Sequence, residues 1–442
     1  MDLLEQLQVN AAPGPDYEPD RTGLVPPPSP PVRLIAYYLP QFHPIPENDE
    51  WWGKGFTEWT NVTKAVPRYV GHYQPRLPGG LGFYDLRLPD TLREQAELAL
   101  RHGIAGFCIH AYWFAGRRLL ETPLEILLQH PDIDLPFCLN WANEPWSRVW
   151  DGSDRQMLIE QRHSPDDDIA FARAIEPALA DPRYIRVDGR PLLMLYRPGL
   201  LPDASGTVDR WREHFTRNGF GEPYIAMPQA FGDLDPTVYG MDAAAGFPPH
   251  PHGWDLPPLD DGLTFLDPAF HGRVLSYDAL AETAAMQPQP NFTLFPGVCP
   301  AWDNEARRAA RGTGFVGSSP RKYGAWLEHA CRRALRAPNP DERIVFINAW
   351  NEWAEGAYLE PDRHYGYAYL RETARTLSRM GQPNQILANE IQASDCAAAN
   401  IVPFTRALTA GNPSSPLRGL IRAARRRGAS AAEALADALR PS

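Results

Sequence analysis

Two glutamates three residues apart, Glu352 and Glu355, are the side chains of this sequence best suited to acid–base chemistry. They follow an apolar run, Ile344–Ile347, and Trp350 and Trp353 are interleaved with them. Three-residue spacing at the start of a helix places both side chains on one face, with Cβ atoms about 5–6 Å apart. Two carboxyl groups at about that separation can act on one glycosidic bond. Indole rings beside them offer an apolar surface to the C–H face of a sugar.

The same spacing also fits a purely structural hypothesis, in which a strand ends and Glu355 only favours the first turn of a capped helix. For an isolated Glu-x-x-Glu motif, that hypothesis would prevail. Two observations favour chemistry here: the interleaved tryptophans, and the polar and aromatic residues that follow the other predicted strands.

Short, continuous apolar runs alternate along the chain with segments of helical periodicity, which indicates parallel strands covered by helices. The predicted strands are 32–39, 104–109, 137–139, 192–196, 224–227, 243–247, 292–298 and 344–347, of which 243–247 has the weakest pattern. The predicted helices are 92–101, 124–130, 169–179, 208–215, 277–285 and 323–335. This alternation predicts an α/β fold, a (β/α)8 TIM barrel with long loops at the C-terminal face of the strands. A doubly wound open sheet is the alternative, although no Gly-x-Gly-x-x-Gly or Walker loop follows any strand.

Polar and aromatic residues gather where the predicted strands end, on the face that carries the catalytic residues of barrel enzymes. Core packing does not explain polar aromatic residues at the same end of so many strands. We therefore predict that substrate is bound on this face by Tyr38, His43, Trp52, Glu58, His110, Tyr112, Trp113, Asn140, Trp141, Asn143, Glu144, Tyr196, Gln229, Trp302, Trp350 and Asn351.

The composition of the 442-residue chain narrows the class of function. A formal charge of -11 argues against a nucleic-acid-binding protein and disfavours anionic polymers as ligands. The five cysteines are scattered without a Cys-x-x-Cys pair, so neither a zinc site nor a disulfide framework is indicated. No apolar run is as long as a transmembrane helix, and the first residues lack the apolar core of a secretory signal. We therefore expect a soluble cytoplasmic protein.

Three segments are expected along the chain. Residues 1–31 form a Pro-rich leader, in which the Pro-rich, polar stretch 11–31 is predicted to be extended and uncollapsed, and residues 32–380 form the catalytic barrel. Residues 381–442 form a helical or disordered basic tail. Its arginines, which fit either a weak membrane-surface contact or, as we favour, a solvated tail, are Arg418, Arg422, Arg425, Arg426 and Arg427.

Four sequence blocks, in this order, resemble the WbsX-type proteins of bacterial polysaccharide gene clusters, which are often labelled glycosyltransferases. The blocks are 37–44, 51–59, 140–146 and 350–356, and the resemblance covers roughly residues 31–375. Those proteins are in turn similar to the endo-α-mannosidases of glycoside hydrolase family 99. This second likeness rests mainly on the Asn-Glu-Trp-x-Glu-Gly pattern at 351–356 and on the predicted barrel.

The resemblance to family 99 implies a role for each motif glutamate. By position, Glu352 resembles the base that takes the proton of the sugar 2-hydroxyl, and Glu355 the acid that protonates the leaving oxygen and later activates water. The implied reaction retains configuration through a 1,2-anhydro sugar, and it needs a 1,2-trans linkage such as an α-mannoside or α-rhamnoside. This chain has Ala354 where the hydrolases carry histidine, which puts the identity of the substrate in doubt more than the chemistry.

Other residues of the candidate site leave alternatives open. Asn143-Glu144-Pro145 resembles the acid–base motif of another large group of barrel glycosidases, but it follows the third predicted strand where that group has the fourth. Glu144 is therefore expected to bind hydroxyls or support charge in the pocket. Glu58 either lines the sugar site or belongs to a lid stabilised by its own tryptophans. His43 and His110 either bind substrate or are structural.

Two further classes of function are carried as alternatives. A metal-dependent glycosyltransferase would need an Asp-x-Asp motif, and three short matches occur, at 132–134, 166–168 and 233–235, without a phosphate-binding loop. A transglycosylase stays open as well, because a retaining intermediate can pass its sugar to a hydroxyl group rather than to water. A non-catalytic polysaccharide-binding protein would need the aromatic residues but not the paired glutamates. His250 and His252 lack an evident third metal ligand, so a loop fixed by proline is favoured there. We predict an endo-acting, retaining glycoside hydrolase of a bacterial polysaccharide, with no cofactor and no metal.

Overall fold

The computed structural model describes residues 1–21, 23, 26–27, 29–147, 157–259 and 262–381. The segment predicted as a basic tail therefore lies outside the described residues from position 382 onward. Within the described ranges, no helix is long and apolar enough to cross a lipid bilayer.

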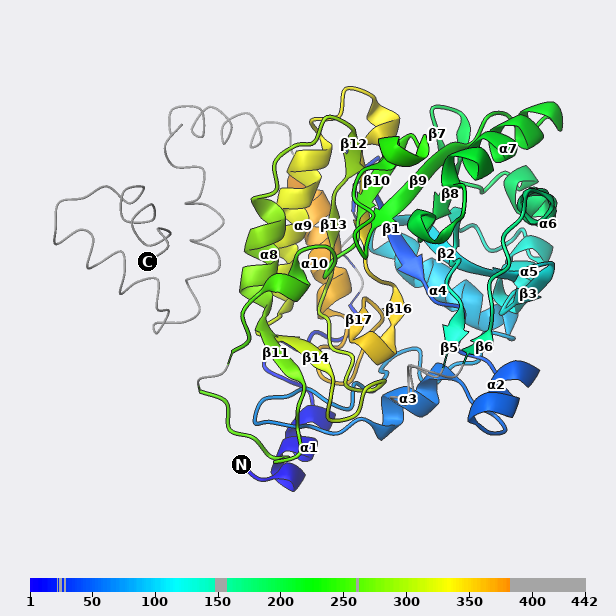
Figure 1. The fold of residues 1–442 in the computed structure, drawn as a ribbon. Coiled ribbons are helices and arrows are strands. Elements are labelled where there is room, and N and C mark those ends of the chain that lie inside the picture. The colour runs from blue at the N-terminus through cyan, green and yellow to red at the C-terminus, as the bar shows by residue number, and fades with distance from the viewer. Residues whose placement is uncertain (22, 24–25, 28, 148–156, 260–261, 382–442) are drawn as a thin grey trace, which may run out of the picture. The chain divides into compact units, whose positions relative to one another are not determined.

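Parallel strands form a barrel at the centre of the described chain (Figure 1). Neighbouring strands pair in the order β12, β10, β9, β8, β4, β2, β1, β15, β13. Because β12 and β13 flank Pro296, and one pairs with β10 while the other pairs with β15, they close the barrel as two parts of one strand. The bounds are β1 Arg33–Tyr38, β2 Ile104–Phe114, β4 Phe137–Trp141, β8 Arg190–Leu195, β9 Tyr224–Gln229, β10 Ala243–Gly246, β12 Thr293–Phe295, β13 Gly297–Val298 and β15 Ile344–Ile347. The predicted (β/α)8 barrel and each of its predicted strands are confirmed.

Helices connect the strands and cover the outside of the barrel (Figure 1). They are α4 Pro89–Arg101, α5 Thr122–Gln129, α6 Pro165–Ala180, α7 Ala204–Arg217, α8 Tyr277–Ala285, α9 Pro320–Ala334 and α10 Ala368–Met380. The six predicted helices fall on the first six of these. Side chains that favour helix starts cap four of them: Ser164, Asp203, Ser276 and Ser319 each accept a backbone N–H of the first turn.

The strands are buried because their apolar residues face both the barrel interior and the surrounding helices. β15 is buried along its whole length and β1 from its second residue onward, as expected of parallel strands covered on both faces. β10 and β13 approach each other too closely for a side chain: a Cβ at Gly297 would lie 2.0 Å from the carbonyl oxygen of Gly246. Glycine is therefore required at this contact between strands.

Short elements extend from the carboxyl ends of the strands, and most of them gather at one end of the barrel, in the lower part of Figure 1. They are α2 Pro46–Trp52, α3 Glu58–Lys64, β3 Arg117–Leu119, β5 Trp146–Ser147, β6 Met157–Ile159, η4 Gly253–Asp255, β11 Arg273–Ser276, β14 Thr313–Val316, β16 Asn351–Glu352, η6 Trp353–Glu355 and β17 Ala357–Tyr358. The other short elements are β7 Arg186–Val187, η2 Pro198–Leu200, η3 Pro236–Tyr239 and η5 Pro340–Glu342. The long loops predicted for the C-terminal face are therefore present.

The amino-terminal segment is bonded to the rest of the chain both before and within residues 11–31, for which the sequence predicts an extended, uncollapsed leader. Residues Leu3–Ala11 form helix α1, which begins with a capping box. Asn10 is buried, and its amide donates to two backbone carbonyl oxygens at 2.8 Å. Glu18 forms ion pairs with Arg371 and Arg375 of α10. Single polar anchors tie this segment to the barrel, and composition alone does not reveal them.

Candidate active site

The two glutamates three residues apart lie on a tight turn, 352–355, that follows the last barrel strand; we call it the glutamate turn. Glu352 ends β16, and Trp353–Glu355 form the 3₁₀ turn η6 rather than the start of an α-helix. A 3₁₀ helix has three residues per turn, so side chains at positions i and i+3 share one face. Gly356 then turns the chain into β17 with φ of 61°, a left-handed conformation that glycine adopts without strain.

Arg307, from the loop between β13 and β14, joins both glutamates of the turn to a third, Glu58, at the start of α3. Its Nη2 lies 2.6 Å from Glu352 Oε1, and its Nη1 lies 2.7 Å from Glu355 Oε1. Nη2 is also 3.2 Å from Glu58 Oε2. We call these four residues the glutamate cluster. Because one guanidinium group reaches Glu352 and Glu355 together, both carboxyl groups face one common space.

Ionisation in the glutamate cluster is set by competition between burial and Arg307. The side chains of Glu58 and Glu352 are 1% and 11% exposed, whereas Glu355 is 29% exposed. Burial raises the pKa of Glu352 well above its usual value; Arg307 opposes this rise, and Glu355 and Glu58 add to it. Burial disfavours the charged form of Arg307, but the three carboxylates outweigh it and raise the pKa of the guanidinium. Three acidic groups therefore face one permanent cation.

The loop that carries Arg307 also holds Glu355 from a second side. The indole N–H of Trp302 donates to Glu355 Oε2 at 3.2 Å, and the backbone N–H of Asp303 donates to the Glu355 carbonyl oxygen at 2.6 Å. The Asp303 carboxylate in turn lies 2.7 Å from His72 Nε2. One Glu355 oxygen thus meets a cation and the other a neutral donor, so its side chain is held in one orientation.

The ends of β2 and β4 supply a wall of neutral polar rings. The hydroxyl of Tyr112 accepts a hydrogen bond from the Gln41 amide at 3.0 Å, and His110 Nδ1 lies 3.1 Å from Asn140 Nδ2. Burial and the positive charge of Arg307 lower the pKa of His110 to about 4, so its imidazole is uncharged at neutral pH. Burial raises the pKa of the Tyr112 hydroxyl; the hydrogen bond from Gln41 and the charge of Arg307 oppose this rise, and Glu352 and Glu58 add to it.

A second ion pair, between Glu144 and Arg197, lies at the ends of β4 and β8. The Arg197 guanidinium bonds Glu144 and lies over the ring of Phe231, 4.0 Å from its centre. Burial raises the pKa of Glu144, Arg197 opposes this, and Glu355 adds to it. Burial also raises the pKa of Tyr196, and Glu144 and Glu355 add to that rise. Glu144 and Tyr196 are therefore close enough to the glutamate turn to share its field.

Several residues predicted to bind substrate have partners inside the protein. Trp141 stacks on Phe171 of α6, with ring centres 4.6 Å apart, and Trp113 donates to Asp167 of the same helix. Successive residues of a strand point to opposite faces, so these two point toward the helices while Asn140 and Tyr112 point inward. The others are Tyr38, bonded to Gln95; Trp350, packed on Phe107; Asn351, bonded to the backbone of Leu39; Asn143, bonded to the backbone of Arg197; and Gln229, bonded to the carbonyl of Leu234. His43 is buried, and neither of its ring nitrogens has a hydrogen-bond partner among the described residues.

Arg307 belongs to the candidate site, and the sequence did not reveal it. It stands in Glu-Ala-Arg-Arg-Ala-Ala-Arg at 305–311, which has the appearance of a charged surface run. Nothing in that segment distinguishes the arginine that turns inward from Arg308, which is exposed. Only the position of the loop against the glutamate turn separates them.

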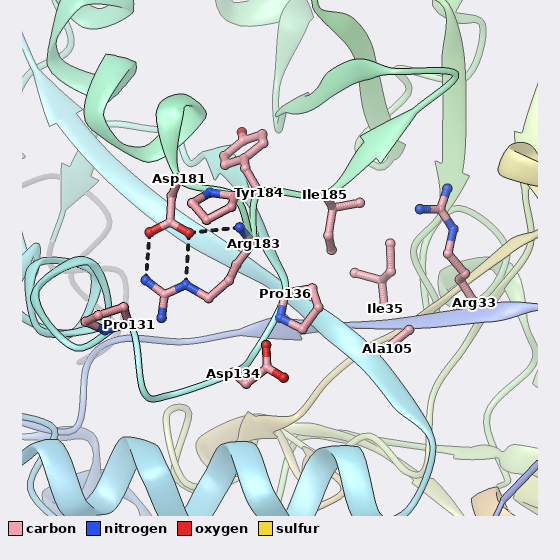
Figure 2. Close-up of a pocket in the computed structure, with 11 residues that line it drawn as sticks. Arg33, Ile35, Ala105, Pro131, Asp134, Pro136, Asp181, Arg183, Tyr184 and Ile185 are labelled. Carbon is pink, nitrogen blue, oxygen red and sulfur yellow. Dashed lines mark hydrogen bonds and ion pairs between the residues drawn. The ribbon is translucent and has the colours of Figure 1, made fainter. Parts of the chain in front are cut away.

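A cavity of about 530 Å³ lies at the opposite end of the barrel, where β1, β2 and β4 begin, beside the segment that leads into β7 (Figure 2). Figure 2 shows Asp181 bonded to Arg183. The Arg183 guanidinium also donates to three backbone carbonyl groups. Arg33 donates to the carbonyl oxygens of Arg186 and Asp341. The arginines of this cavity are thus engaged by the protein itself, and the cavity lies away from the face at which barrel enzymes work.

A buried carboxyl group, Glu360, lies beneath the glutamate turn and is held by three neutral donors. Trp353, the residue after Glu352, donates to it at 2.6 Å, Gln95 of α4 at 2.6 Å and Tyr84 at 2.8 Å. Burial raises the pKa of Glu360 to about 7, against the hydrogen bonds, which lower it. This contact ties the glutamate turn to the helix layer.

We expect Glu360 to make the folded protein less stable as the pH rises from about 4.5 to about 7. Its pKa is 4.5 in the unfolded chain and about 7 in the folded protein, so within this window the folded state holds a proton that the unfolded state has lost. The stabilisation is complete below pH 4.5 and is lost as the pH approaches 7, about 3 kcal/mol in all. Urea unfolding at several pH values, compared with Glu360→Gln, measures it. If the difference in unfolding free energy between the wild type and the variant does not change with pH, the prediction is wrong.

The model of a family described as "Glycosyltransferase WbsX" matches residues 34–373 of this chain. The chain is 50% identical, over 350 residues, to "Uncharacterized protein WxcX" from each of two strains of Xanthomonas campestris pv. campestris. That match covers 79% of this chain and 50% of the relative, so the chain spans about half the length of the curated relatives it matches.

Solved structures give more distant matches. A "Glycoside hydrolase-like protein" shares 14% identity at a TM-score of 0.49, covering 82% of this chain and 98% of that one. A GH99 endo-alpha-mannosidase from Bacteroides thetaiotaomicron shares 16% identity at a TM-score of 0.48, covering 80% and 98%. At identities this low, the activities named for those two proteins are theirs alone.

Proposed function

The chain belongs to the WbsX family, described as glycosyltransferases, and we propose that its own reaction is the cleavage of a glycosidic bond with retention of configuration. The substrate is a bacterial surface polysaccharide with an α-manno- or α-rhamno-configured linkage, cut within the chain. Glu352 and Glu355 carry the reaction, and the residues around them bind the sugar.

One observation carries this proposal: Glu352 and Glu355 face one space at the C-terminal end of the barrel, joined by the same guanidinium group. Barrel enzymes work at this end. The two carboxyl groups also differ in environment, because Glu352 is buried and Glu355 is partly exposed. Paired carboxyl groups in unequal environments suit separate roles as base and acid.

The proposed roles follow from those environments. In the first step Glu352 takes the proton of the sugar 2-hydroxyl, O2 attacks C1, and the bond from C1 to the leaving oxygen breaks as Glu355 protonates that oxygen. In the second step Glu355 takes a proton from water, the water oxygen attacks C1, and the C1–O2 bond breaks as Glu352 returns its proton to O2. Burial, which raises the pKa of Glu352, makes it a stronger base for a hydroxyl proton. Exposure lets Glu355 reach the leaving group and water.

Charge disfavours a nucleotide sugar as the donor at this site. The space between the glutamates is bordered by the acidic groups Glu58, Glu352, Glu355 and Glu144, against two cations, Arg307 and Arg197. Both cations are already bonded to these carboxylates. A diphosphate placed here would meet like charges within a buried site, which is costly.

The three Asp-x-Asp segments also have structural partners. In 166–168 the second and third aspartates bond Trp113 and Arg210, and in 233–235 the two aspartates bond Tyr239 and Thr237. Asp134 of 132–134 lines the cavity at the opposite end of the barrel. Among the described residues, no three His, Cys, Asp or Glu side chains are arranged to hold a metal ion.

Digestion of the host strain's own surface polysaccharide tests the proposal. Incubation with the full chain should release new reducing ends, and mass analysis should show fragments of several repeat units whose new reducing end keeps its anomeric configuration. A run in H₂¹⁸O distinguishes hydrolysis, which labels that end, from transfer to another hydroxyl. If no ends are released, and UDP- or GDP-sugars raise the melting temperature in the presence of Mn²⁺, the glycosyltransferase activity by which the family is described holds instead.

A further inference from the structure

A small cleft opens next to the glutamate cluster, between α2 and the β5–β6 hairpin. Its lining residues are Gln41, Asn48, Trp52, Phe56, Glu58, Trp146 and Leu158. Glu58 belongs to both the cleft and the cluster, so a ligand in the cleft lies beside any sugar held between Glu352 and Glu355. The cleft uses only described residues and two elements that the proposed reaction does not use.

Asn48 gives the cleft an unused hydrogen-bonding group. Asn48 is 3% exposed, and its side chain has no hydrogen-bond partner in the described part of the chain. The polar atoms of this amide remain accessible at the cleft, where they can bond a ligand. Gln41 is 7% exposed, and its NH₂ group donates a hydrogen bond to the Tyr112 hydroxyl. Its side-chain carbonyl oxygen has no partner among the described residues. The cleft therefore offers both donors and an acceptor.

Aromatic rings form the walls around these amides. Trp146 packs edge-on against Tyr112 and Trp51, with ring centres 5.2 and 5.8 Å apart, and Trp52 lies 5.8 Å from Phe56. Indole faces beside amide groups suit the C–H face and the hydroxyl groups of a sugar ring. The enclosed part measures about 30 Å³, close to the ~30 Å³ that one water molecule occupies in the liquid. It therefore admits one hydroxyl or hydroxymethyl group, while the ring lies at the mouth.

We propose that this cleft is a second sugar subsite, which binds the residue next to the one that is cleaved. The inference rests on the proposed function, because it takes the glutamate turn as the point of cleavage. Its ligand is an uncharged pyranose that directs one hydroxyl or hydroxymethyl group toward Asn48. An acidic sugar is excluded because its carboxylate would meet Glu58. The protein thus recognises at least two consecutive sugar residues.

Titration calorimetry with sized fragments tests the subsite. Mild-acid fragments of the host strain's surface polysaccharide, separated into mono-, di- and tetrasaccharides, are titrated into the full chain, into Asn48→Ala and into Trp52→Leu. Loss of these contacts should weaken binding of the di- and tetrasaccharides about tenfold and leave monosaccharide binding unchanged. Asn291→Ala, an exposed asparagine next to the start of β12, is the matched control, and melting temperatures check that each variant is folded.

The outcomes separate the subsite from the proposed function. If both variants bind disaccharide as the wild type does, or lose mono- and disaccharide affinity equally, the second subsite is wrong, whatever the cleavage assay shows. If the variants lose only disaccharide affinity, the subsite stands, even where the wild type releases no reducing ends and the proposed hydrolysis fails.

Discussion

Glu352→Gln and Glu355→Gln should each abolish turnover of the polysaccharide while binding of its fragments remains measurable. Each substitution keeps the shape of the side chain and removes a proton-transfer group, which typically contributes ~10²–10⁴-fold to the rate. Reducing-end release measures turnover, and calorimetry with the tetrasaccharide measures binding. Glu97→Gln, on an exposed position of α4, is the matched control and should behave as the wild type.

A substrate with a good leaving group separates the two roles. A nitrophenyl glycoside needs little protonation of its leaving oxygen, so Glu355→Gln should recover the first step, seen as a burst of nitrophenol. Glu352→Gln should not, because the 2-hydroxyl still lacks its base. If both variants hydrolyse the polymer at nearly the wild-type rate, the glutamate turn is not the catalytic centre. A burst from Glu352→Gln alone would reverse the two assignments.

Arg307→Lys is expected to lower kcat about 10²–10³-fold, the usual effect of removing one fixed electrostatic partner from a buried site. Lysine keeps the charge but cannot reach Glu352 and Glu355 through two separate nitrogens as the guanidinium does. The effect on the pH profile has a definite sign. Arg307 lowers the pKa of Glu352, so weakening this contact raises that pKa, and the ascending limb of kcat/KM moves to higher pH.

Controls distinguish this effect from loss of folding. Arg308→Ala removes the exposed neighbouring arginine and should leave both kcat and the pH profile unchanged. Arg307→Ala leaves three carboxylates without their cation, a defect that typically costs 3–5 kcal/mol, so its melting temperature should fall. Added guanidinium ions should restore part of its activity. An Arg307→Lys enzyme with the wild-type kcat and pH profile would show that the arginine takes no part in the reaction.

The sequence determined the barrel and the position of the glutamate turn on it. Parallel strands must bury both faces, so each appears as a continuous apolar run, and even the weakly patterned 243–247 proved to be β10. The polar residues that follow such runs must then lie at one end of the barrel, which placed Glu352, Glu355, His110 and Tyr112 on one face. These inferences needed only local periodicity and the geometry that parallel strands share.

Only the tertiary structure decided which side chains face the common space. Neighbouring residues on one strand, such as Tyr112 and Trp113, point to opposite faces of the sheet. A run of polar and aromatic residues in the sequence does not tell which of them points into the barrel. Arg307 lies 45 residues from Glu352 in the chain, and it meets Glu352 and Glu355 because a loop folds back over the barrel end. A contact between distant segments leaves no periodic trace in the sequence. The paired glutamates could therefore be found from their spacing, whereas the cation that joins them could not.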